Sequence, residues 1–579
     1  MYDLSEDKLF KPFDNNIDKP NILAFLRRVL RPDMSFLLTC IIYGLIISLL
    51  SLATPISVQF LINSVAFMAM VQPIIIIGTL LFILLSFSAI LHAIQFYVTE
   101  IFQRRFFARM AAEVGNSLLK AQYKTFEQAN QSEMVNRFFE TVTIQKSVPQ
   151  FLTKTFSLIL QTIAGLILVS FYHPLFLLFS ILVVGFLYLV WKLHYRKALV
   201  SAFYESRRKY DIVGWLEDIA CGHVAFKSTI GVNYARYKID FLTKCYLKER
   251  KKHFYSLFSQ VILLLIFYVI ASVSLLMFGA MLVLKGQLTI GQLVAAELVL
   301  SALFYRISQA GRDLEGFYDL VAACEKLSQF QNIPSEEAEG ALLQNDAIAI
   351  NFDDVTYKNA NRQYHFNLKF AANKNYIIAT GGFSTKKALI DLLCGFANPA
   401  HGLVEINGTD IRSLNRYDLR SKIAIIDNAQ LLEGTIEEYL TFFDKSVAQS
   451  DVNWALKVTG LDRLILKSKD GLDTRIIPSG WPLSESEKIL LKIARILIQK
   501  PKLIIITEVL DMLVLGARQR ILHYLTKESL ATVIYFSHRV DGVMDFDNYI
   551  FVDKAKHYEF SSIQELDNFE KEHYGTKNK

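Results

Sequence analysis

Three long stretches of the sequence contain no Asp, Glu, Lys or Arg, and they are the strongest constraint on its fold. They are Met34–Thr99, Thr155–Trp191 and Phe254–Leu284. A helix needs about 20 mainly apolar residues to cross the hydrocarbon core of a bilayer. The first two stretches are each long enough for two crossings, and the third is long enough for one. The sequence therefore predicts that the N-terminal half of the chain spans a membrane.

The composition agrees with this prediction. The chain is 52% hydrophobic with a mean hydropathy of +0.29, which is too apolar for an ordinary soluble protein. Breaks at Val71–Pro73 and Tyr172–Pro174 divide the first two stretches, and Leu288–Ile307 supplies a further crossing. We predict six spans, at about residues 34–66, 71–100, 153–172, 174–195, 254–284 and 288–309.

Basic residues set the orientation of these spans, because cytoplasmic loops carry an excess of Lys and Arg. The connection between spans two and three contains Arg104, Arg105, Arg109, Lys120, Lys124, Arg137 and Lys146. The connection between spans four and five ends in Lys248–Lys252, whereas the opposite loops carry only Lys285. We therefore expect both long connections and both termini in the cytoplasm. The net charge of +7 reflects this asymmetry, and we expect no nucleic-acid partner.

The N-terminus shows no cleavable signal, because Met1–Pro20 is polar and rich in acidic residues. Residues 21–30 mix apolar and basic side chains and predict an elbow helix lying in the membrane interface. The five cysteines have no ligand spacing, so we interpret them as reduced core thiols and predict no metal site.

The pattern changes after the last span. A polar linker is predicted at 331–346, and from residue 347 short apolar runs alternate with helical patterns. This alternation favours an α/β domain with a largely parallel sheet. The predicted strands are Ala349–Tyr357, Tyr376–Thr380, Leu403–Ile406, Ile423–Ile426, Leu503–Ile506, Val533–Phe536 and Tyr549–Val552. The predicted domains are thus a membrane domain at 1–330, the linker at 331–346 and an α/β domain at 347–579.

Residues 380–395 occupy the context of a phosphate-binding loop, because a predicted strand precedes them and an amphipathic helix follows. Such a loop uses glycines to close its backbone N–H groups around phosphates, a Lys for their charge, and a Ser or Thr for Mg²⁺. The candidate nucleotide-binding residues here are Gly381, Gly382, Ser384, Thr385, Lys386 and Lys387.

A six-span block followed by such a domain resembles a half-size exporter of the ABC transporter superfamily. Further passages carry the resemblance: Leu288–Val294, Leu403–Arg420, Gly434–Ile436 and Ala494–Arg495. It implies six transmembrane helices of the ABC exporter type, followed by a P-loop NTPase-like ABC nucleotide-binding domain.

The resemblance also shows which phosphate-loop residues have changed. The family's three glycines fall on Thr380, Phe383 and Thr385, and its Mg²⁺-binding hydroxyl falls on Lys387. Only Lys386 matches. Three interpretations stay open. The loop no longer binds nucleotide and only caps a helix, it binds nucleotide weakly with Lys387 replacing the charge of the metal, or it binds ATP in the ordinary way.

The adenine-stacking aromatic of the family falls on Asn359, and only Tyr364 lies near enough in sequence to replace it. An amide offers a poor π face, so base stacking is lost unless Tyr364 substitutes.

The candidate catalytic residues are Glu508, which matches the family's general base, and His538, which matches its switch histidine. Either these two residues still act in catalysis, or they are vestigial and serve only local hydrogen bonds. Thr507 replaces the Asp that orients Mg²⁺. The family's coupling-loop Gln, which reaches both Mg²⁺ and the membrane domain, falls on Asp427 or Asn428.

The signature motif of the family falls on Ser484, Glu485, Ser486 and Glu487. In the working motif, backbone N–H groups at this helix N-terminus bind the γ-phosphate held by the opposite subunit. Ser484 and Glu487 instead have the spacing of a capping box. We expect the helix to satisfy its own end, and its two carboxylates to disfavour closure around ATP bound by a partner.

Glu297 stands inside the sixth span. Because intramembrane charge is expensive and usually faces a cavity or a partner, Glu297 is a candidate for lining a membrane pathway. An interfacial position near the outer leaflet is the alternative.

The resemblance implies dimerisation with a second ABC half transporter, identical or different, in a lipid bilayer, with an unknown transported substrate. We expect a multi-pass protein of a bacterial inner membrane that is the inactive or weakly active subunit of an ATP-driven export system. We expect ATP to bind weakly and Mg²⁺ not to bind normally. The alternatives are an ATP-independent scaffold or regulator and a slow homodimeric ATPase.

The topology can be tested by cysteine labelling. Cysteines introduced at Lys120 and Lys209 should be shielded from an impermeant reagent added outside the cell, because the basic connections stay in the cytoplasm. A cysteine introduced at Gln72 should react. Labelling of the Lys209 position from outside would contradict the topology.

Overall fold

The computed structural model describes residues 22–67, 71–128, 131–336, 339–344, 347–359, 362–427, 431–442, 444, 446–537, 546–554 and 556–574. The chain divides into two compact units. The first comprises Met1–Ala121 and Thr125–Pro334, and the second comprises Gln122–Lys124 and Ser335–Lys579.

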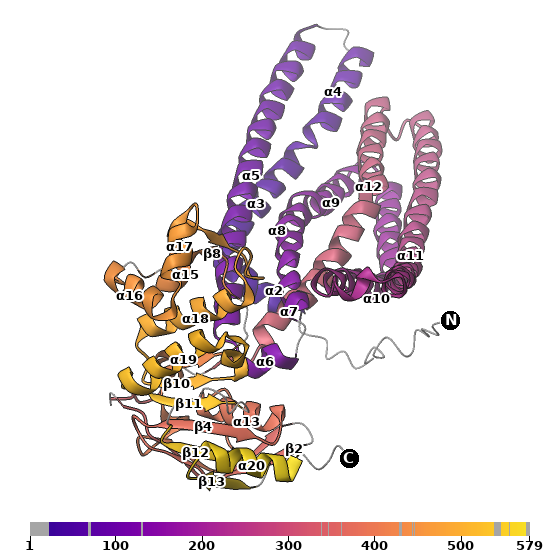
Figure 1. Ribbon diagram of the computed structural model, residues 1–579. Helices are drawn as coiled ribbons and strands as arrows, with labels where there is room; N and C mark the ends of the chain where they lie inside the picture. The colour runs from indigo at the N-terminus through magenta and orange to yellow at the C-terminus, as the bar shows by residue number, and fades with distance from the viewer. Residues whose placement is uncertain are drawn as a thin grey trace. The chain divides into compact units, whose positions relative to one another are not determined.

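The first unit is built from helices alone in the part of it that the structure describes (Figure 1). Its longer helices are α2 (Ile22–Leu30), α3 (Met34–Leu50), α4 (Ala53–Phe67), α5 (Val71–Leu119), α8 (Glu140–Gln150), α9 (Ser157–Ser170), α10 (Pro174–Cys221), α11 (Thr229–Leu284) and α12 (Ile290–Ser328). Short helices are η1 (Arg31–Asp33), α6 (Tyr123–Gln128), α7 (Gln131–Asn136), η2 (Arg137–Phe139), η3 (Phe151–Phe156), η4 (Ala225–Lys227) and η5 (Gln329–Asn332). Of α6, the residues Tyr123 and Lys124 belong to the second unit.

Among the described residues of this unit, five helical segments are long and apolar enough to cross a membrane, and Ile290–Ala302 at the start of α12 is a shorter apolar helix. The helices pack on one another through a core of apolar side chains, with Phe176, Val183 and Leu275 among its members. Many other large apolar side chains stay exposed, such as Phe82 and Phe96 of α5. That distribution is expected of helices whose outer faces meet lipid. The expected all-helical N-terminal domain is present, with helices long and apolar enough to cross a membrane.

The short helix η1 holds the most deeply buried ion pair of the described part of this unit. The Asp33 side chain is fully buried, and its carboxylate accepts from Arg109 at 2.7 Å and lies 3.1 Å from Arg105. Arg109 also donates to the backbone oxygen of Val29 at 2.6 Å. These contacts fasten α2 and the start of α3 to α5. A buried carboxylate requires such partners, because an unpaired buried charge is costly.

The second unit contains two main β-sheets with helices around them. Its strands are β1 (Ile350–Asn359), β2 (Arg362–Phe366), β3 (Lys369–Phe370), β4 (Asn375–Thr380), β5 (His401–Ile406), β6 (Thr409–Asp410), β7 (Ile423–Ile426), β8 (Gly434–Thr435), β9 (Arg475–Ile476), β10 (Leu503–Ile506), β11 (Thr532–Phe536), β12 (Asn548–Val552) and β13 (His557–Phe560).

The helices of this unit follow the same order along the chain. They are α13 (Phe383–Leu393), η6 (Ile411–Ser413), α14 (Arg416–Ser421), α15 (Ile436–Thr441), α16 (Gln449–Thr459), α17 (Asp462–Lys467), η7 (Gly471–Asp473), α18 (Glu485–Gln499), η8 (Glu508–Met512), α19 (Leu515–His523), η9 (Tyr524–Glu528) and α20 (Ile563–Tyr574).

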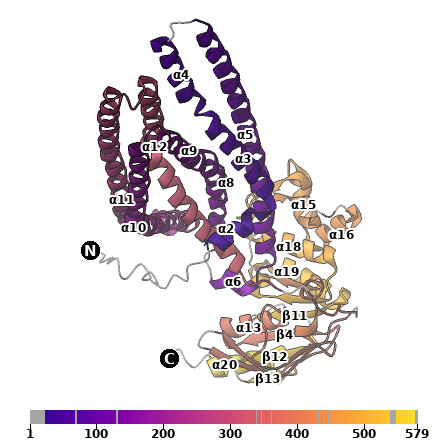
Figure 2. The same cartoon turned by 180° about the vertical axis from the view of Figure 1, so that it is seen from behind.

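The larger sheet has the strand order β13-β12-β4-β11-β10-β7, and all neighbouring strands run parallel except the edge pair β12–β13. Figure 2 shows strands β11, β4, β12 and β13 lying side by side from behind. Both faces are covered: Ile504 and Ile506 of β10 belong to one apolar core, and Leu503 and Ile505 belong to the other. This double burial explains the continuous apolar run of β10.

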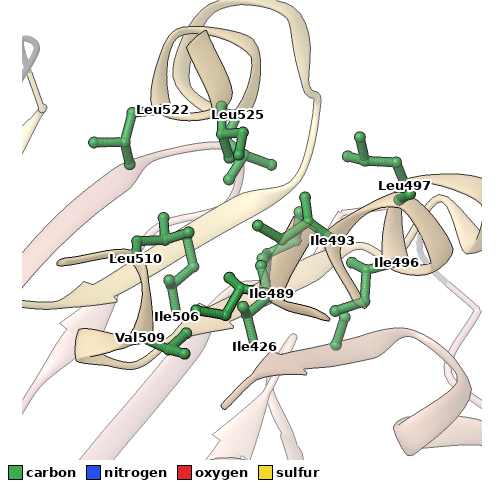
Figure 3. Close-up of a cluster of buried hydrophobic side chains, with 14 of the residues drawn as sticks. Ile426, Ile489, Ile493, Ile496, Leu497, Ile506, Val509, Leu510, Leu522 and Leu525 are labelled. Carbon is green, nitrogen blue, oxygen red and sulfur yellow. The ribbon is translucent and has the colours of Figure 1, made fainter. Parts of the chain in front are cut away.

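Helix α18 covers one face of this sheet. Figure 3 shows Ile489, Ile493, Ile496 and Leu497 on its buried side, near Ile426, Ile506, Val509 and Leu510. Their spacing follows the helical period, so a single apolar stripe faces the sheet. This packing fixes where the first turn of α18 lies.

Two features differ from the sequence prediction. The predicted parallel sheet is present, but β1 and β5 belong to a separate antiparallel sheet of order β2-β1-β5-β6. The sequence analysis also did not predict six strands of the described residues, namely β2, β3, β6, β8, β9 and β13. Four of them have only two residues, and β2 and β13 are mostly exposed, so they carry little apolar periodicity. In addition, Leu343, in the segment expected to be a polar linker, is buried in the core of the second unit.

The anchor at Asp33 can be tested by stability measurements. Asp33→Ala should lower the unfolding free energy by about 3 kcal/mol, because Arg109 would remain buried without its carboxylate. Glu113→Ala should cost less than about 1 kcal/mol, because that partner of Arg109 is exposed. The thermal unfolding midpoint of the protein in detergent measures both effects. Equal shifts for the two variants would contradict the assigned anchor.

Candidate functional site

The candidate site forms at one edge of the larger sheet. Strands β4 and β10 are parallel and are separated only by β11, so the segments that follow them emerge at the same edge. A cavity of about 640 Å³ lies there. It is lined by Tyr123, Phe383, Lys386, Lys387, Ile390, Asp391, Phe396, Ile425, Asp427, Thr507, Glu508, Val509 and Met512.

The phosphate loop is short in this chain. Helix α13 begins at Phe383, so only Gly381 and Gly382 separate it from β4. The N–H groups of Thr385 and Lys386 donate to the carbonyl of Gly382, at 3.0 and 3.3 Å. The N–H of Gly381 donates to the carbonyl of Val552 at 3.0 Å. These three N–H groups are therefore engaged within the protein, whereas a phosphate nest needs them turned inward.

Lys386 and Glu508 form an ion pair across the cavity. The buried ammonium of Lys386 donates to the carboxylate of Glu508, and it lies 4.7 Å from the centre of the Phe383 ring. The phosphate-binding lysine and the general base expected from the family thus neutralise each other. This contact could not be read from the sequence, because the two residues are 122 positions apart.

The side chains at the positions expected to hold Mg²⁺ provide few oxygen ligands for a metal ion. Lys387 carries an ammonium, which cannot ligate a cation, and it pairs with the buried carboxylate of Asp391 at 3.3 Å. The hydroxyl of Thr507 donates to the backbone carbonyl of Ile426 at 3.0 Å. Because Mg²⁺ requires several oxygen ligands in near-octahedral geometry, these residues do not fit it.

The adenine side of the candidate site also lacks a free aromatic face. Tyr364, the possible substitute for Asn359, is only 2% exposed. It lies between Tyr357 and Phe366, with ring centroids 6.2 Å from each. Asn359 ends β1 and pairs with Arg362 of β2. The alternative in which Tyr364 replaces the stacking residue is therefore wrong, because its ring is buried in the apolar core.

Asp511, in the segment after β10, is the centre of a cluster of polar contacts that the sequence analysis did not predict. The hydroxyls of Tyr535 and Ser537 donate to its carboxylate, and the guanidinium of the buried Arg518 lies 3.3 Å away. Burial and the neighbouring Asp511 carboxylate raise the pKa of Tyr535. The partners come from β11, the residue after it and α19, so no local sequence pattern indicates this cluster.

The signature segment contains the predicted capping box. The hydroxyl of Ser484 accepts from the N–H of Glu487 at 3.4 Å, and the Glu487 carboxylate accepts from the N–H of Ser484 at 2.7 Å. Glu485 is mostly exposed and pairs with Lys488 at 2.7 Å. Ser486 lies between the two carboxylates in the first turn of α18.

Of the coupling-loop candidates and the switch histidine, the structure describes only Asp427. Asp427 follows β7 and lines the cavity, and its backbone carbonyl accepts from Lys492 at 3.1 Å. Burial lowers the pKa of Lys492. Asn428, His538 and the neighbouring Gln430 lie outside the described residues.

Glu297 lies between two helices of the first unit. One of its carboxylate oxygens accepts from Ser272 of α11 and from Ser301 of α12, each at 3.0 Å. Its other oxygen is buried and has no hydrogen-bond partner. This arrangement places the carboxylate within helix packing.

Comparisons with known proteins agree with this architecture. A family model described as the ABC transporter transmembrane region matches residues 37–214, and a model described as ABC transporter matches residues 367–510. Together they cover more than half of the chain. The chain belongs to the ABC transporter superfamily.

Curated relatives of this ABC protein are export systems by name. A putative export ATP-binding/permease protein of Rickettsia typhi is 27% identical over 310 residues, which is 50% of this chain and 53% of the relative. A β-(1→2)glucan export ATP-binding/permease protein of Bartonella henselae is 30% identical over 312 residues, 51% of each chain. The chain thus matches about half the length of these relatives.

A solved structure supports the same fold over nearly the whole chain. It is a bacterial Atm1-family ABC exporter with ATP bound, and it matches with a TM-score of 0.80. The match covers 94% of this chain and 97% of that one, at 19% identity. At this identity the likeness establishes the fold, and function needs its own evidence.

The Asp511 cluster predicts a stability effect. Asp511→Ala should destabilise the second unit by about 3 kcal/mol, because it removes a carboxylate from the buried Arg518. Asp451→Ala, which removes an exposed partner of Lys500, should cost less than about 1 kcal/mol. Pulse proteolysis of the second unit in urea measures both. A neutral result for Asp511→Ala would show that other groups neutralise Arg518.

Proposed function

We propose that the chain is one half of a dimeric ABC exporter, and that its own nucleotide-binding domain binds ATP weakly and does not hydrolyse it. The two family matches, the fold and the export names of its relatives support the exporter assignment. The substrate stays open, because the glucan named for the Bartonella relative belongs to that protein.

The observation that carries the proposal is the ion pair between Lys386 and Glu508. Phosphate binding requires the lysine to meet an anion, and general-base catalysis requires the carboxylate to meet the attacking water. Each group instead meets the other. An incoming triphosphate must break this contact before it gains its own contact with Lys386.

The other changes act in the same direction. The engaged N–H groups of the short loop, the buried Tyr364 ring and the ammonium of Lys387 each remove one contact that a bound Mg²⁺–ATP would use. The carboxylates of Glu485 and Glu487 add repulsion toward ATP held by a second subunit. Because the chain alters both its phosphate loop and its signature, both composite sites of a dimer are affected.

In this proposal the first unit spans a bacterial inner membrane and the second unit lies in the cytoplasm. A half transporter encloses a pathway only with a second half, so the chain acts as a dimer. Glu297 is a proposed pathway residue only if dimer formation or a change of conformation exposes its carboxylate, since helix packing now covers one of its oxygens.

A nucleotide titration of the purified chain tests the proposal. We expect weak ATP binding that changes less than about twofold when Mg²⁺ is added, because the metal lacks protein ligands. Turnover should not exceed background. Glu508→Gln should leave turnover unchanged and tighten ATP binding roughly threefold, because Lys386 loses its internal partner.

Lys386→Ala combined with Glu508→Gln is the matched control. It should abolish the gain in affinity, because no cation remains to be released. A steep loss of turnover in Glu508→Gln alone would show that the domain hydrolyses ATP and would contradict the proposal.

A further inference from the structure

Glu297 stands alone as a charged residue in the apolar part of α12. It is the only Asp, Glu, Lys or Arg between Lys285 and Arg306 in the sequence. Arg306 follows roughly 14 Å further along the helix, since each residue adds about 1.5 Å. Ala296 and Leu300, on either side of Glu297, belong to a buried apolar core. The carboxyl group therefore lies in apolar surroundings, far along its own helix from any basic residue.

The helices packed against this part of α12 bring no charge to it. They are α4, α9, α10 and α11, and a Cβ atom on Gly165 of α9 would lie only 2.6 Å from Val299 of α12. Helices α4 and α9 contain no Asp, Glu, Lys or Arg, and neither do Pro174–Trp191 of α10 and Phe254–Leu284 of α11. The other titratable side chains of these segments are the uncharged phenols of Tyr188, Tyr255 and Tyr268.

The charged residues of neighbouring elements lie near the other end of α12. Tyr318 shares an apolar core with α10 and α11, and Leu320 shares one with α2 and α8. The ring of Phe317 lies 5.7 Å from that of Phe151 in η3. These contacts are roughly 30 Å from Glu297 along α12. The charged residues at that level include Glu140, Lys154, Glu205, Lys209 and Arg250. They are too distant to neutralise Glu297.

The two oxygens of the Glu297 carboxyl group have different surroundings. The hydroxyls of Ser272 and Ser301 both donate to Oε1, each at 3.0 Å. Oε2 is buried and has no hydrogen-bond partner among the described residues. An ionised carboxylate would leave this oxygen charged and unpaired in an apolar interior, which is costly. A protonated carboxyl carries no charge and has only one O–H group to satisfy. The packing of α11 and α12 therefore favours the neutral form.

We propose that Glu297 is a proton-binding site of the membrane domain, which holds a proton while α11 and α12 pack around it and exchanges that proton with water when they separate. On binding, a hydronium ion gives its proton to Oε2, an O–H bond forms there, and a water molecule is left. Release reverses this step and needs no reactant other than water. The inference rests on the half exporter proposed above, and it adds the ligand of Glu297.

A proton fits this site better than a metal cation. The described oxygens are one carboxyl group and two hydroxyls, and both hydroxyls already donate to Oε1. Hard metal cations such as Ca²⁺ and Mg²⁺ require about six or more oxygen ligands. A proton requires only the one oxygen that lacks a partner.

Proton binding and helix packing then favour each other, because such coupling is reciprocal. The packed arrangement binds the proton, so an acidic medium favours packing around Glu297 and an alkaline medium favours its opening. A change of conformation in the membrane domain would thus take up or release a proton at each chain, whether or not ATP is used.

Infrared spectroscopy of the full chain in nanodiscs tests the proposal. A protonated carboxyl in apolar surroundings gives a carbonyl stretching band that an ionised carboxylate lacks. We expect this band in the native chain at about pH 7, where an ordinary glutamate is ionised, and we expect its loss in Glu297→Gln. The matched control is Glu100→Gln, which changes an exposed glutamate that pairs with Arg104. It should leave the band unchanged.

A titration of the same band tests exchange with water. The band should disappear reversibly as the medium is made alkaline. Ser272→Ala removes one donor that stabilises the ionised form, so loss of the band should then need a roughly tenfold lower proton concentration. This variant keeps Glu297 itself, and it assigns the band to this site even if Glu297→Gln does not assemble.

Absence of the band in the native chain, or its persistence in Glu297→Gln, would overturn the inference. A band that does not respond to an alkaline medium would also overturn it, because the proton would not exchange with water. Loss of the band when sodium replaces potassium at constant pH would assign a metal cation to the site instead. All of these results would leave the half exporter in place. The particle mass of the same samples tests that function separately, since one copy per nanodisc would contradict the dimer.

Discussion

The parallel hydrogen bonding of β4, β11, β10 and β7 is the constraint on which the candidate site depends. Parallel strands end at the same edge of a sheet, so Lys386 after β4 and Glu508 after β10 meet although they are distant in sequence. Apolar cores on both faces hold these strands in register. Lys386, Lys387 and Glu508 lie outside that hydrogen-bonded framework, since the two lysines follow β4 and the glutamate follows β10. The geometry of a nucleotide site can therefore persist while its chemistry changes.

Electrostatic differences from the family pattern underlie the proposed weak nucleotide binding. Where the family pattern has a glycine and a hydroxyl, this chain has Phe383 and Lys387. The first turn of α13 therefore carries two lysines, and each is paired with a carboxylate of the same chain. The acidic first turn of α18 changes in the opposite sense. Each of these differences favours the proposed weak nucleotide binding.

Several elements of the fold could be predicted from the sequence, and other features could not. The strands β4, β7, β10, β11 and β12 were predicted within about two residues at their ends, because buried parallel strands are continuous apolar runs. The capping box at Ser484 was also predictable, because its partners are three residues apart. In contrast, the burial of Tyr364 depends on strand pairing with Tyr357, and the Asp511 cluster joins residues from three elements. Asn428 and His538 lie outside the described residues, so their roles remain predictions.

The sequence by itself determined that the chain spans a membrane, that an α/β domain follows, and which family positions are altered. These properties depend on local hydropathy, periodicity and motif spacing, which one chain segment carries alone. Only the tertiary structure decided that Lys386 is paired with Glu508, that Tyr364 is inside the core, and that one oxygen of Glu297 is covered. Those outcomes depend on which distant segments meet. That meeting is set by strand order and helix packing, and no local pattern of residues specifies it.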